Sequence, residues 1–137
     1  MVELVTLRDM EFTSLPENIN LIEVLVEELK SELDLSEEAE ANILVSLSEA
    51  VNNAIFHGNK SDPAKKVRVC VEKLDKEIVF SIEDQGFGFN LSEVKDPTAI
   101  ENLDRPTGRG IFLMRNLSDR MEYSDGGRKV VITFFRS

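Results

Sequence analysis

Residues 66–84, KVRVCVEKLDKEIVFSIED, decide the fold of this chain. Apolar and polar side chains alternate over Lys66–Leu74 and again over Glu77–Glu83, which predicts two strands that each bury one face. Because only two residues separate these strands, we expect them to form an antiparallel hairpin. The hairpin ends at Asp84, so a carboxylate is expected where its second strand leaves the sheet.

Upstream of the hairpin, the chain predicts one strand followed by two helices. The sequence Ser14-Leu-Pro-Glu17 matches a capping box. Asp34 or Ser36 can cap the second helix, and Gly58 is a natural terminator for it. The three elements are a strand over Val2–Thr13, a helix over about 15–33 and a helix that runs on to His57.

Downstream of the hairpin, residues 85–107 are expected to form a long connection with a short helix near 97–103. A third main helix is predicted over Gly110–Ser118. Two further strands, Arg120–Ser124 and Arg128–Phe135, then pair across a short turn. Hairpins interleaved with helices predict an α+β fold, a two-layer sandwich with helices on one face of a mixed, mainly antiparallel sheet.

The composition of the chain limits the kinds of protein it can be. Its 137 residues, 42% hydrophobic and 31% charged, fit one domain over 1–137 with a core of its own. No apolar stretch reaches the length of a membrane span and the first residues lack a signal sequence, so we expect no membrane partner and a cytoplasmic location. Cys70 is the single cysteine, which excludes an internal disulfide. The net charge of -10 argues against a nucleic-acid partner.

The negative charge is concentrated in the first part of the chain. Residues 1–50 hold 13 acidic and 2 basic residues, whereas residues 51–137 hold 13 acidic and 14 basic ones. Glu27, Glu28 and Glu32 are expected on the exposed side of the first helix. These carboxylates either only keep the helices solvated or form a surface that meets a basic protein partner.

The second helix carries a polar face that can serve as a pocket wall. At 100° per residue, Glu49 and Asn53 stack one turn apart, on the side opposite the apolar stripe. A carboxylate there can deprotonate an attacking hydroxyl, and the amide oxygen can bind Mg²⁺. Ser46 and His57 share this face, and Val45 and Phe56 flank it. Taken alone, the pattern also fits the outer face of an ordinary amphipathic helix.

Two glycine-containing segments suit a nucleotide. Asp84 can accept a hydrogen bond from an exocyclic amine, and the glycines that follow let the backbone approach a flat ring. Thr107-Gly-Arg-Gly110 leads into the third helix, whose first N–H groups can bind phosphates together with Arg105 and Arg109. No GKS or GKT follows, so this is not a Walker loop. A simple glycine turn and a helix cap would explain each segment separately.

Read in order, the three segments resemble the GHKL (Bergerat-fold) ATPases across nearly the whole chain. The Glu49–Gly58 segment, ExxxNAxxHG, matches the N box, and DxGxGF and GRGIxLM match the two glycine boxes. The resemblance implies binding of ATP and Mg²⁺. It also implies that Glu49 is the general base, Asn53 the Mg²⁺ ligand and Asp84 the adenine-recognising carboxylate. The residues of the two glycine boxes would be Gly86 and Gly88 in the first and Thr107, Gly108, Arg109 and Gly110 in the second. The resemblance further implies that Arg105 contacts the γ-phosphate.

Within this family, the chain is most similar to the small bacterial anti-sigma factors that are serine kinases. Its one histidine, His57, lies inside the N box, so no phosphorelay histidine is available, and 137 residues leave no room for the added domains of gyrase-like relatives. The resemblance implies a homodimer that binds a sigma factor and phosphorylates a serine of a small antagonist protein. Two other functions remain open, a nucleotide-regulated binding module without transfer and an ATP hydrolase that uses water.

Overall fold

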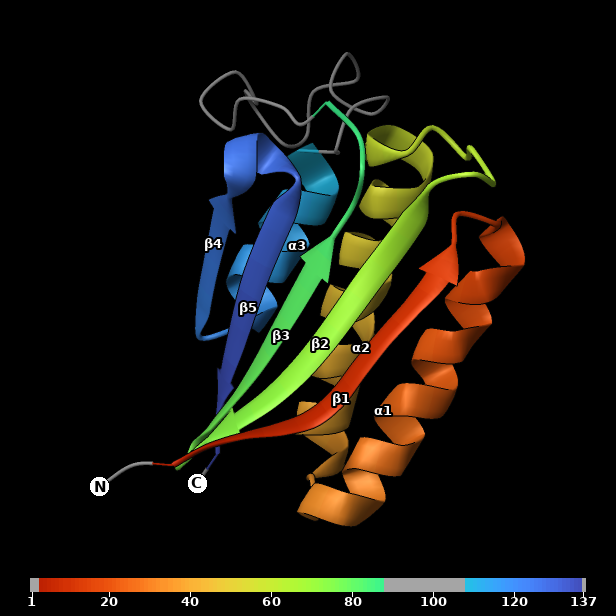
Figure 1. Ribbon diagram of the computed structural model, residues 1–137. Helices are drawn as coiled ribbons and strands as arrows, with labels where there is room; N and C mark the ends of the chain where they lie inside the picture. The colour runs from red at the N-terminus through yellow and green to blue at the C-terminus, as the bar shows by residue number, and fades with distance from the viewer. Residues whose placement is uncertain (1–2, 88–107, 137) are drawn as a thin grey trace.

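The computed structural model describes residues 3–87 and 108–136, which form a five-stranded sheet with its helices on one face (Figure 1). The strand order is β1-β2-β3-β5-β4. The strands are β1 (Leu4–Thr13), β2 (Lys66–Leu74), β3 (Glu77–Glu83), β4 (Arg120–Ser124) and β5 (Lys129–Phe135). The helical elements are η1 (Pro16–Ile19), α1 (Asn20–Leu33), α2 (Glu37–Asn52), η2 (Asn53–Gly58), α3 (Gly108–Leu117) and η5 (Asp125–Gly127).

The predicted α+β two-layer sandwich is confirmed, with one difference in the sheet. Every pair of neighbouring strands among the described residues is antiparallel, whereas the sequence had suggested a mixed sheet. β3 and β4 do run in the same direction, but β5 lies between them and is antiparallel to both. No parallel pair therefore forms in the described sheet.

The core lies between the sheet and the helices, as the alternating pattern predicts. Strands β2, β3 and β5 each bury every second side chain, and the helices cover them with aliphatic residues. Burying one such side chain stabilises the fold by roughly 1.5–3 kcal/mol. The largest fully buried side chains are Phe80, Ile22, Leu29, Ile43, Leu47, Ile55, Ile78, Ile82, Met114, Ile132, Val26 and Val51.

The helix starts follow the sequence in one case and depart from it in another. Ser36 caps α2, because its Oγ accepts a hydrogen bond of 3.0 Å from the backbone N–H of Ala39. The predicted capping box at Ser14 is wrong, since no side chain caps the start of η1. The buried Ser14 hydroxyl instead donates to the backbone oxygen of Lys65 at 2.7 Å, which ties the end of β1 to the segment before β2.

The helix that carries Asn53 continues to Gly58, one residue past the predicted end at His57, and its last turn is a π turn, η2. The backbone N–H of Asn59 bonds to the oxygen of Ala54, five residues back, at 2.8 Å. Gly58 does not end the helix in a left-handed conformation. Lys60 and Ser61, with φ of 52° and 58°, take that conformation instead.

The third helix, α3, begins at Gly108, two residues earlier than expected, and ends at Leu117. The expected short helix near 97–103 lies outside the described residues. No helix within residues 3–87 or 108–136 has the length and apolar character that a membrane crossing requires.

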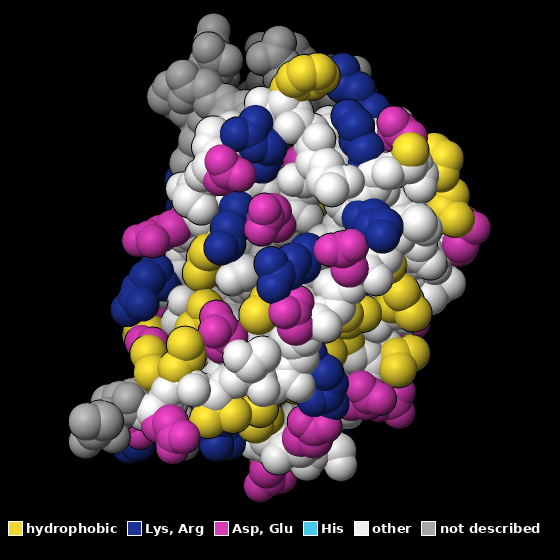
Figure 2. Space-filling view, in the orientation of Figure 1, with side chains coloured by type: hydrophobic (Ala, Val, Ile, Leu, Met, Phe, Trp, Pro, Cys, Tyr) yellow, Lys and Arg dark blue, Asp and Glu magenta, His cyan; other side chains and the backbone are white. Residues whose placement is uncertain are grey.

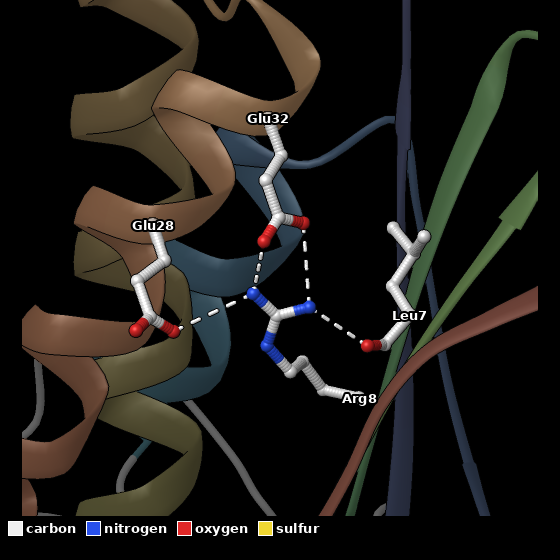
Figure 3. Close-up of polar contacts among 4 residues, drawn as sticks. All are labelled: Leu7, Arg8, Glu28 and Glu32. Carbon is white, nitrogen blue, oxygen red and sulfur yellow. Dashed lines mark hydrogen bonds and ion pairs between the residues drawn. The ribbon is translucent and has the colours of Figure 1, made fainter.

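Arg8 joins the edge strand β1 to helix α1 (Figure 3). The register of β1 against β2 shifts between Thr6 and Arg8, which is a β-bulge. The Arg8 guanidinium binds both carboxylate oxygens of Glu32, contacts Glu28 at 3.5 Å and donates to the backbone oxygen of Leu7 at 2.8 Å. Glu28 and Glu32 are exposed as expected, but they also hold α1 against the sheet.

The face of the sheet that lies opposite the helices carries charges of both signs. Figure 2 shows Lys and Arg side chains interspersed with Asp and Glu across this face. Arg68 pairs with Asp9 at 2.8 Å and Lys66 pairs with Glu11 at 3.4 Å. Part of the acidic excess of residues 1–50 is therefore neutralised by cations from β2.

Candidate functional site

A cavity lies at the end of the sheet where β3 ends and β5 begins, and residues from distant parts of the chain line it. The end of α2, η2, β3, β4 and the β4–β5 turn all contribute (Figure 1). Asn53 and Asp84, predicted as site residues from separate motifs, meet there. The described lining residues are Ala50, Asn53, Ala54, His57, Gly58, Ile82, Asp84, Tyr123, Gly127, Arg128 and Val130.

Asp84 is held between two glycines that leave no room for a side chain. A Cβ atom on Gly58 would lie 2.4 Å from Cγ of Asp84, and one on Gly86 would lie 2.0 Å from the backbone oxygen of Gly58. Both distances are far below van der Waals contact. Gly58 is therefore required by the site, because the Asp84 carboxylate sits directly against its backbone.

The Asp84 carboxylate is partly satisfied and keeps capacity to bind a ligand. Its Oδ1 accepts a hydrogen bond of 2.8 Å from the backbone N–H of Gly86. Burial raises the pKa of Asp84, while that hydrogen bond and the charge of Arg128 act in the opposite direction. Since a carboxylate has about four acceptor positions, the group can also accept from a donor inside the cavity.

Asn53 offers the cavity an amide with one unpaired end. It is 8% exposed, and its Nδ2 has no hydrogen-bond partner among the described residues. Its side chain is a hydrogen-bonding neighbour of Tyr123, whose phenol has a pKa raised mainly by burial. The unpaired nitrogen is itself buried, so the structure shows an orphaned amide beside the cavity. Oxygen and nitrogen of an amide exchange places on a 180° turn, so either end of this side chain can serve a ligand that enters the cavity.

Glu49 lies next to the start of α3 and is not among the described residues that line the cavity. Burial raises the pKa of this half-buried carboxyl, and the nearby charge of Arg109 partly offsets that rise. Gly108 and Gly110 belong to the first turn of α3, as the sequence predicts. The structure thus brings the N-box carboxylate close to the second glycine segment.

Some of the predicted site lies elsewhere or is not described. Gly88, Arg105 and Thr107 fall outside the described residues. On α2, the predicted polar face is only in part a pocket wall, because Ser46 is fully buried with no hydrogen-bond partner for its hydroxyl among the described residues. Val45, expected to flank the pocket, is exposed and is not among its described lining residues. The wall is formed instead around Asn53, with the small side chains of Ala50 and Ala54 beside it.

The sequence analysis missed three residues of this region. Tyr123 and Arg128 reach the cavity from β4 and from the turn before β5, and no motif marks them. Asn59 is 1% exposed and lies directly behind the cavity, where it binds the residue after Asp84. In the sequence, its position directly after the N box was the one available signal. Its burial, which is unusual for a polar side chain, is visible only in the structure.

Comparison with known proteins identifies the family. The model of the histidine kinase-like ATPase domain matches residues 12–134. An anti-sigma F factor from Clostridium perfringens is 35% identical over 129 residues, which cover 90% of this chain and 91% of that protein. An anti-sigma F factor from Shouchella clausii is 33% identical over 117 residues, which cover 83% of this chain and 80% of that protein.

A solved structure supports the fold. The crystal structure of the RsbU and RsbW domains of a Mycobacterium tuberculosis protein matches with a TM-score of 0.64 and 16% identity, covering 94% of this chain and 32% of that longer one. Three observations point to the same family: the family model that matches 12–134, the two relatives, and the cavity that Asn53 and Asp84 share. The chain belongs to the histidine kinase-like ATPase domain family and, within it, to the anti-sigma F factor relatives.

Proposed function

We propose that residues 1–137 act as one ATP-binding kinase domain, an anti-sigma factor that phosphorylates a serine of a small antagonist protein. The observation that carries this proposal is the shared cavity of Asn53 and Asp84, which come from the N box and the first glycine box. The relatives named anti-sigma F factor support a sigma factor as the second partner. The family resemblance further supports a cytoplasmic homodimer.

In this proposal Asp84 recognises the adenine. Its carboxylate accepts a hydrogen bond from the exocyclic amine. Gly58 and Gly86 have no side chains, so the ring can approach the backbone closely there. Gly88 of the same motif would extend this surface. The apolar side chain of Ile82 lines the same cavity and can contact the ring.

We assign the start of α3 as the part of the site that binds the phosphates of ATP. The first N–H groups of this helix and its positive dipole end favour anions, and Arg109 adds a cation there. Thr107, Gly108 and Gly110 would shape this loop, and Arg105 would contact the γ-phosphate. Asn53 would hold Mg²⁺, which needs only one or two protein ligands besides phosphate and water oxygens. The ion would neutralise charge on the phosphates.

Glu49 is assigned as the general base. The serine oxygen of the antagonist forms a bond to the γ-phosphorus, the bond from that phosphorus to the departing ADP oxygen breaks, and Glu49 takes the serine proton. Its raised pKa suits proton acceptance better than that of a fully solvated glutamate. Arg109, whose charge acts on Glu49, keeps the carboxylate available in its ionised form.

Transfer of labelled phosphate tests the proposal. Purified protein is incubated with Mg²⁺, γ-labelled ATP and a candidate antagonist, and the label is expected on one serine of the antagonist. Nucleotide binding without any labelled partner would favour the binding module. ATP turnover without a partner would favour the hydrolase.

Replacing Asp84 by asparagine should weaken nucleotide binding but stabilise the nucleotide-free fold. The variant keeps an oxygen for the Gly86 N–H but adds donors where the amine must donate, so ADP should bind about 5- to 150-fold more weakly, equivalent to about 1–3 kcal/mol. The raised pKa means that the charged carboxylate destabilises the free fold at neutral pH, a cost that disappears as the pH falls through that pKa.

The melting temperature of the nucleotide-free Asp84→Asn variant should therefore lie above that of the wild type at pH 7, and the difference should shrink in acid. Calorimetry with ADP and thermal melts over a pH series measure both effects. Unchanged ADP affinity would remove Asp84 from the site.

The acidic surface of α1 and α2 can be tested with charge reversals that spare the Arg8 pairs. Glu23, Glu27 and Glu38 are exposed and form no ion pair within residues 3–87 and 108–136. If these carboxylates steer a basic partner, reversing all three to lysine should slow association about tenfold and flatten its salt dependence. Reversing Glu28 or Glu32 would instead release Arg8 and confuse the result.

Association rates with the sigma factor at low and high salt provide the measurement. Glu122→Lys, on β4 at the other edge of the sheet, is the control for a single reversal such as Glu27→Lys. ADP affinity should not change in any of these variants. Equal rates and equal salt slopes would show that the acidic side chains only keep the surface solvated.

A further inference from the structure

The residue that follows the N box, Asn59, uses its whole side chain to hold the turn that carries Asp84. Its Oδ1 accepts a hydrogen bond of 2.7 Å from the backbone N–H of Gln85. Its Nδ2 donates to Ser14 Oγ at 2.7 Å and to the backbone oxygen of Lys66 at 3.0 Å. We call Ser14, Asn59 and Gln85 with these bonds the Asn59 network.

Two of the three side chains of the network are buried inside the protein, whereas Gln85 lies at the surface. Ser14 and Asn59 are 0% and 1% exposed, and the Ser14 hydroxyl donates a hydrogen bond to the backbone oxygen of Lys65. The Gln85 side chain completes the network, since its Oε1 accepts from the backbone N–H of Lys66 at 2.7 Å. A buried amide with all its hydrogen bonds made has one orientation available to it.

Three successive backbone N–H groups after β3 are each held by a different partner. The N–H of Asp84 donates to the backbone oxygen of Arg128 at 2.9 Å, and that of Gly86 donates to the Asp84 carboxylate at 2.8 Å. The N–H of Gln85, between them, depends on Asn59. Without Asn59, the peptide that joins Asp84 to Gln85 loses its restraint on that side.

From this geometry we propose that Asn59 is a positioning residue for base recognition. It fixes the direction of the Asp84 carboxylate and so sets how well the protein distinguishes a base with an exocyclic amine from one without it. The inference rests on the proposed function, in which Asp84 binds the adenine amine. Asn59 itself lies behind the cavity and touches no nucleotide.

Two ligands separate this role from a general structural one. ADP carries the 6-amino group, and purine riboside diphosphate lacks it but is otherwise the same. In calorimetry with Mg²⁺, Asn59→Ala should weaken ADP binding about tenfold and change purine riboside diphosphate binding less than about twofold. In an Asp84→Asn background, Asn59→Ala should cause no further loss of ADP affinity, because its effect passes through the carboxylate.

Asn18→Ala is the matched control. Asn18 also donates two amide hydrogen bonds at the end of β1, to the backbone oxygen of Thr13 at 2.8 Å and to its hydroxyl at 2.9 Å, and neither bond involves Gln85. This variant should leave the preference for ADP unchanged. Gln85→Ala, at an exposed position, removes only the bond to Lys66 and should reduce the preference about threefold.

Each result is decisive. If the wild type binds both diphosphates equally, the assignment of Asp84 to the amine fails, and the proposed function loses its base contact. If the wild type prefers ADP and Asn59→Ala keeps that preference, Asp84 stands but the positioning role of Asn59 is refuted. Should thermal melts show that Asn59→Ala does not fold, Asn59→Ser decides, because its side chain is polar but too short for the bond to Gln85, and an unchanged preference in that variant overturns the proposal.

Discussion

Replacing Glu49 by alanine should reduce phosphoryl transfer by about 10²–10⁴-fold while ADP affinity stays within about twofold of the wild type. The half-buried carboxylate is not among the described residues that line the cavity of Asn53 and Asp84, so its removal leaves the assigned adenine contacts in place. Its assigned work, acceptance of the serine proton, matters mainly in the transition state. The loss should therefore appear in turnover.

Single-turnover transfer to the antagonist measures this effect, and Glu49→Gln separates loss of the charge from loss of the side-chain volume. Glu37→Ala, an exposed change on the same helix, is the matched control. In the wild type, the transfer rate should fall with decreasing pH sooner than a solvated glutamate would require, because burial raises the pKa of Glu49. Near-normal transfer by Glu49→Ala would eliminate it as the general base.

Gly86→Ala should damage the adenine end of the site more than any other single methyl group placed there. The added Cβ would meet the backbone oxygen of Gly58 at 2.0 Å and its carbonyl carbon at 2.6 Å, and backbone atoms cannot move aside as a flexible side chain can. One of the two segments must shift, which typically costs about 1–3 kcal/mol in stability. Asp84 lies on the shifting segment, so ADP affinity should fall about 100-fold or more.

Chemical denaturation and calorimetry test both parts of this prediction. Gly126→Ala is the control, because Gly126 has a φ of +64° and only the Arg128 side chain, at 3.7 Å, near its added Cβ. That variant should lose about 1 kcal/mol from backbone strain yet bind ADP normally. Normal affinity and stability in Gly86→Ala would contradict the contact between the two glycine segments.

The parts of the fold that could be predicted from the sequence are those in which apolar and polar side chains repeat with a simple period. The alternation in β2 and β3 gave both strands and their hairpin, and the three motifs pointed to one ATP site before any geometry was known. The π turn at Asn53 has no such signature, because a bond that spans five residues leaves the apolar pattern of a helix nearly unchanged. The sequence therefore predicted where that helix ends but not how it ends.

Other features depended on partners far away in the chain. Ser14 resembles a cap locally, yet its hydroxyl is used by Lys65, about 50 residues later. Tyr123 enters the cavity only because β4 and β5 place it there, and its own neighbours in sequence suggest nothing of the kind. The acidic residues Glu28 and Glu32 were expected to face solvent or a basic partner, but Arg8, next to the bulge in β1, pairs with both.

The Asn59 network also bears on when the site exists during folding. Its bonds join residues 45 and 26 positions apart in the sequence, so they cannot form until β1, β2 and β3 have assembled. A local fluctuation of one loop cannot break them without disturbing the strands that they connect. The end of the cavity that holds Asp84 therefore forms late in folding and opens only together with the sheet.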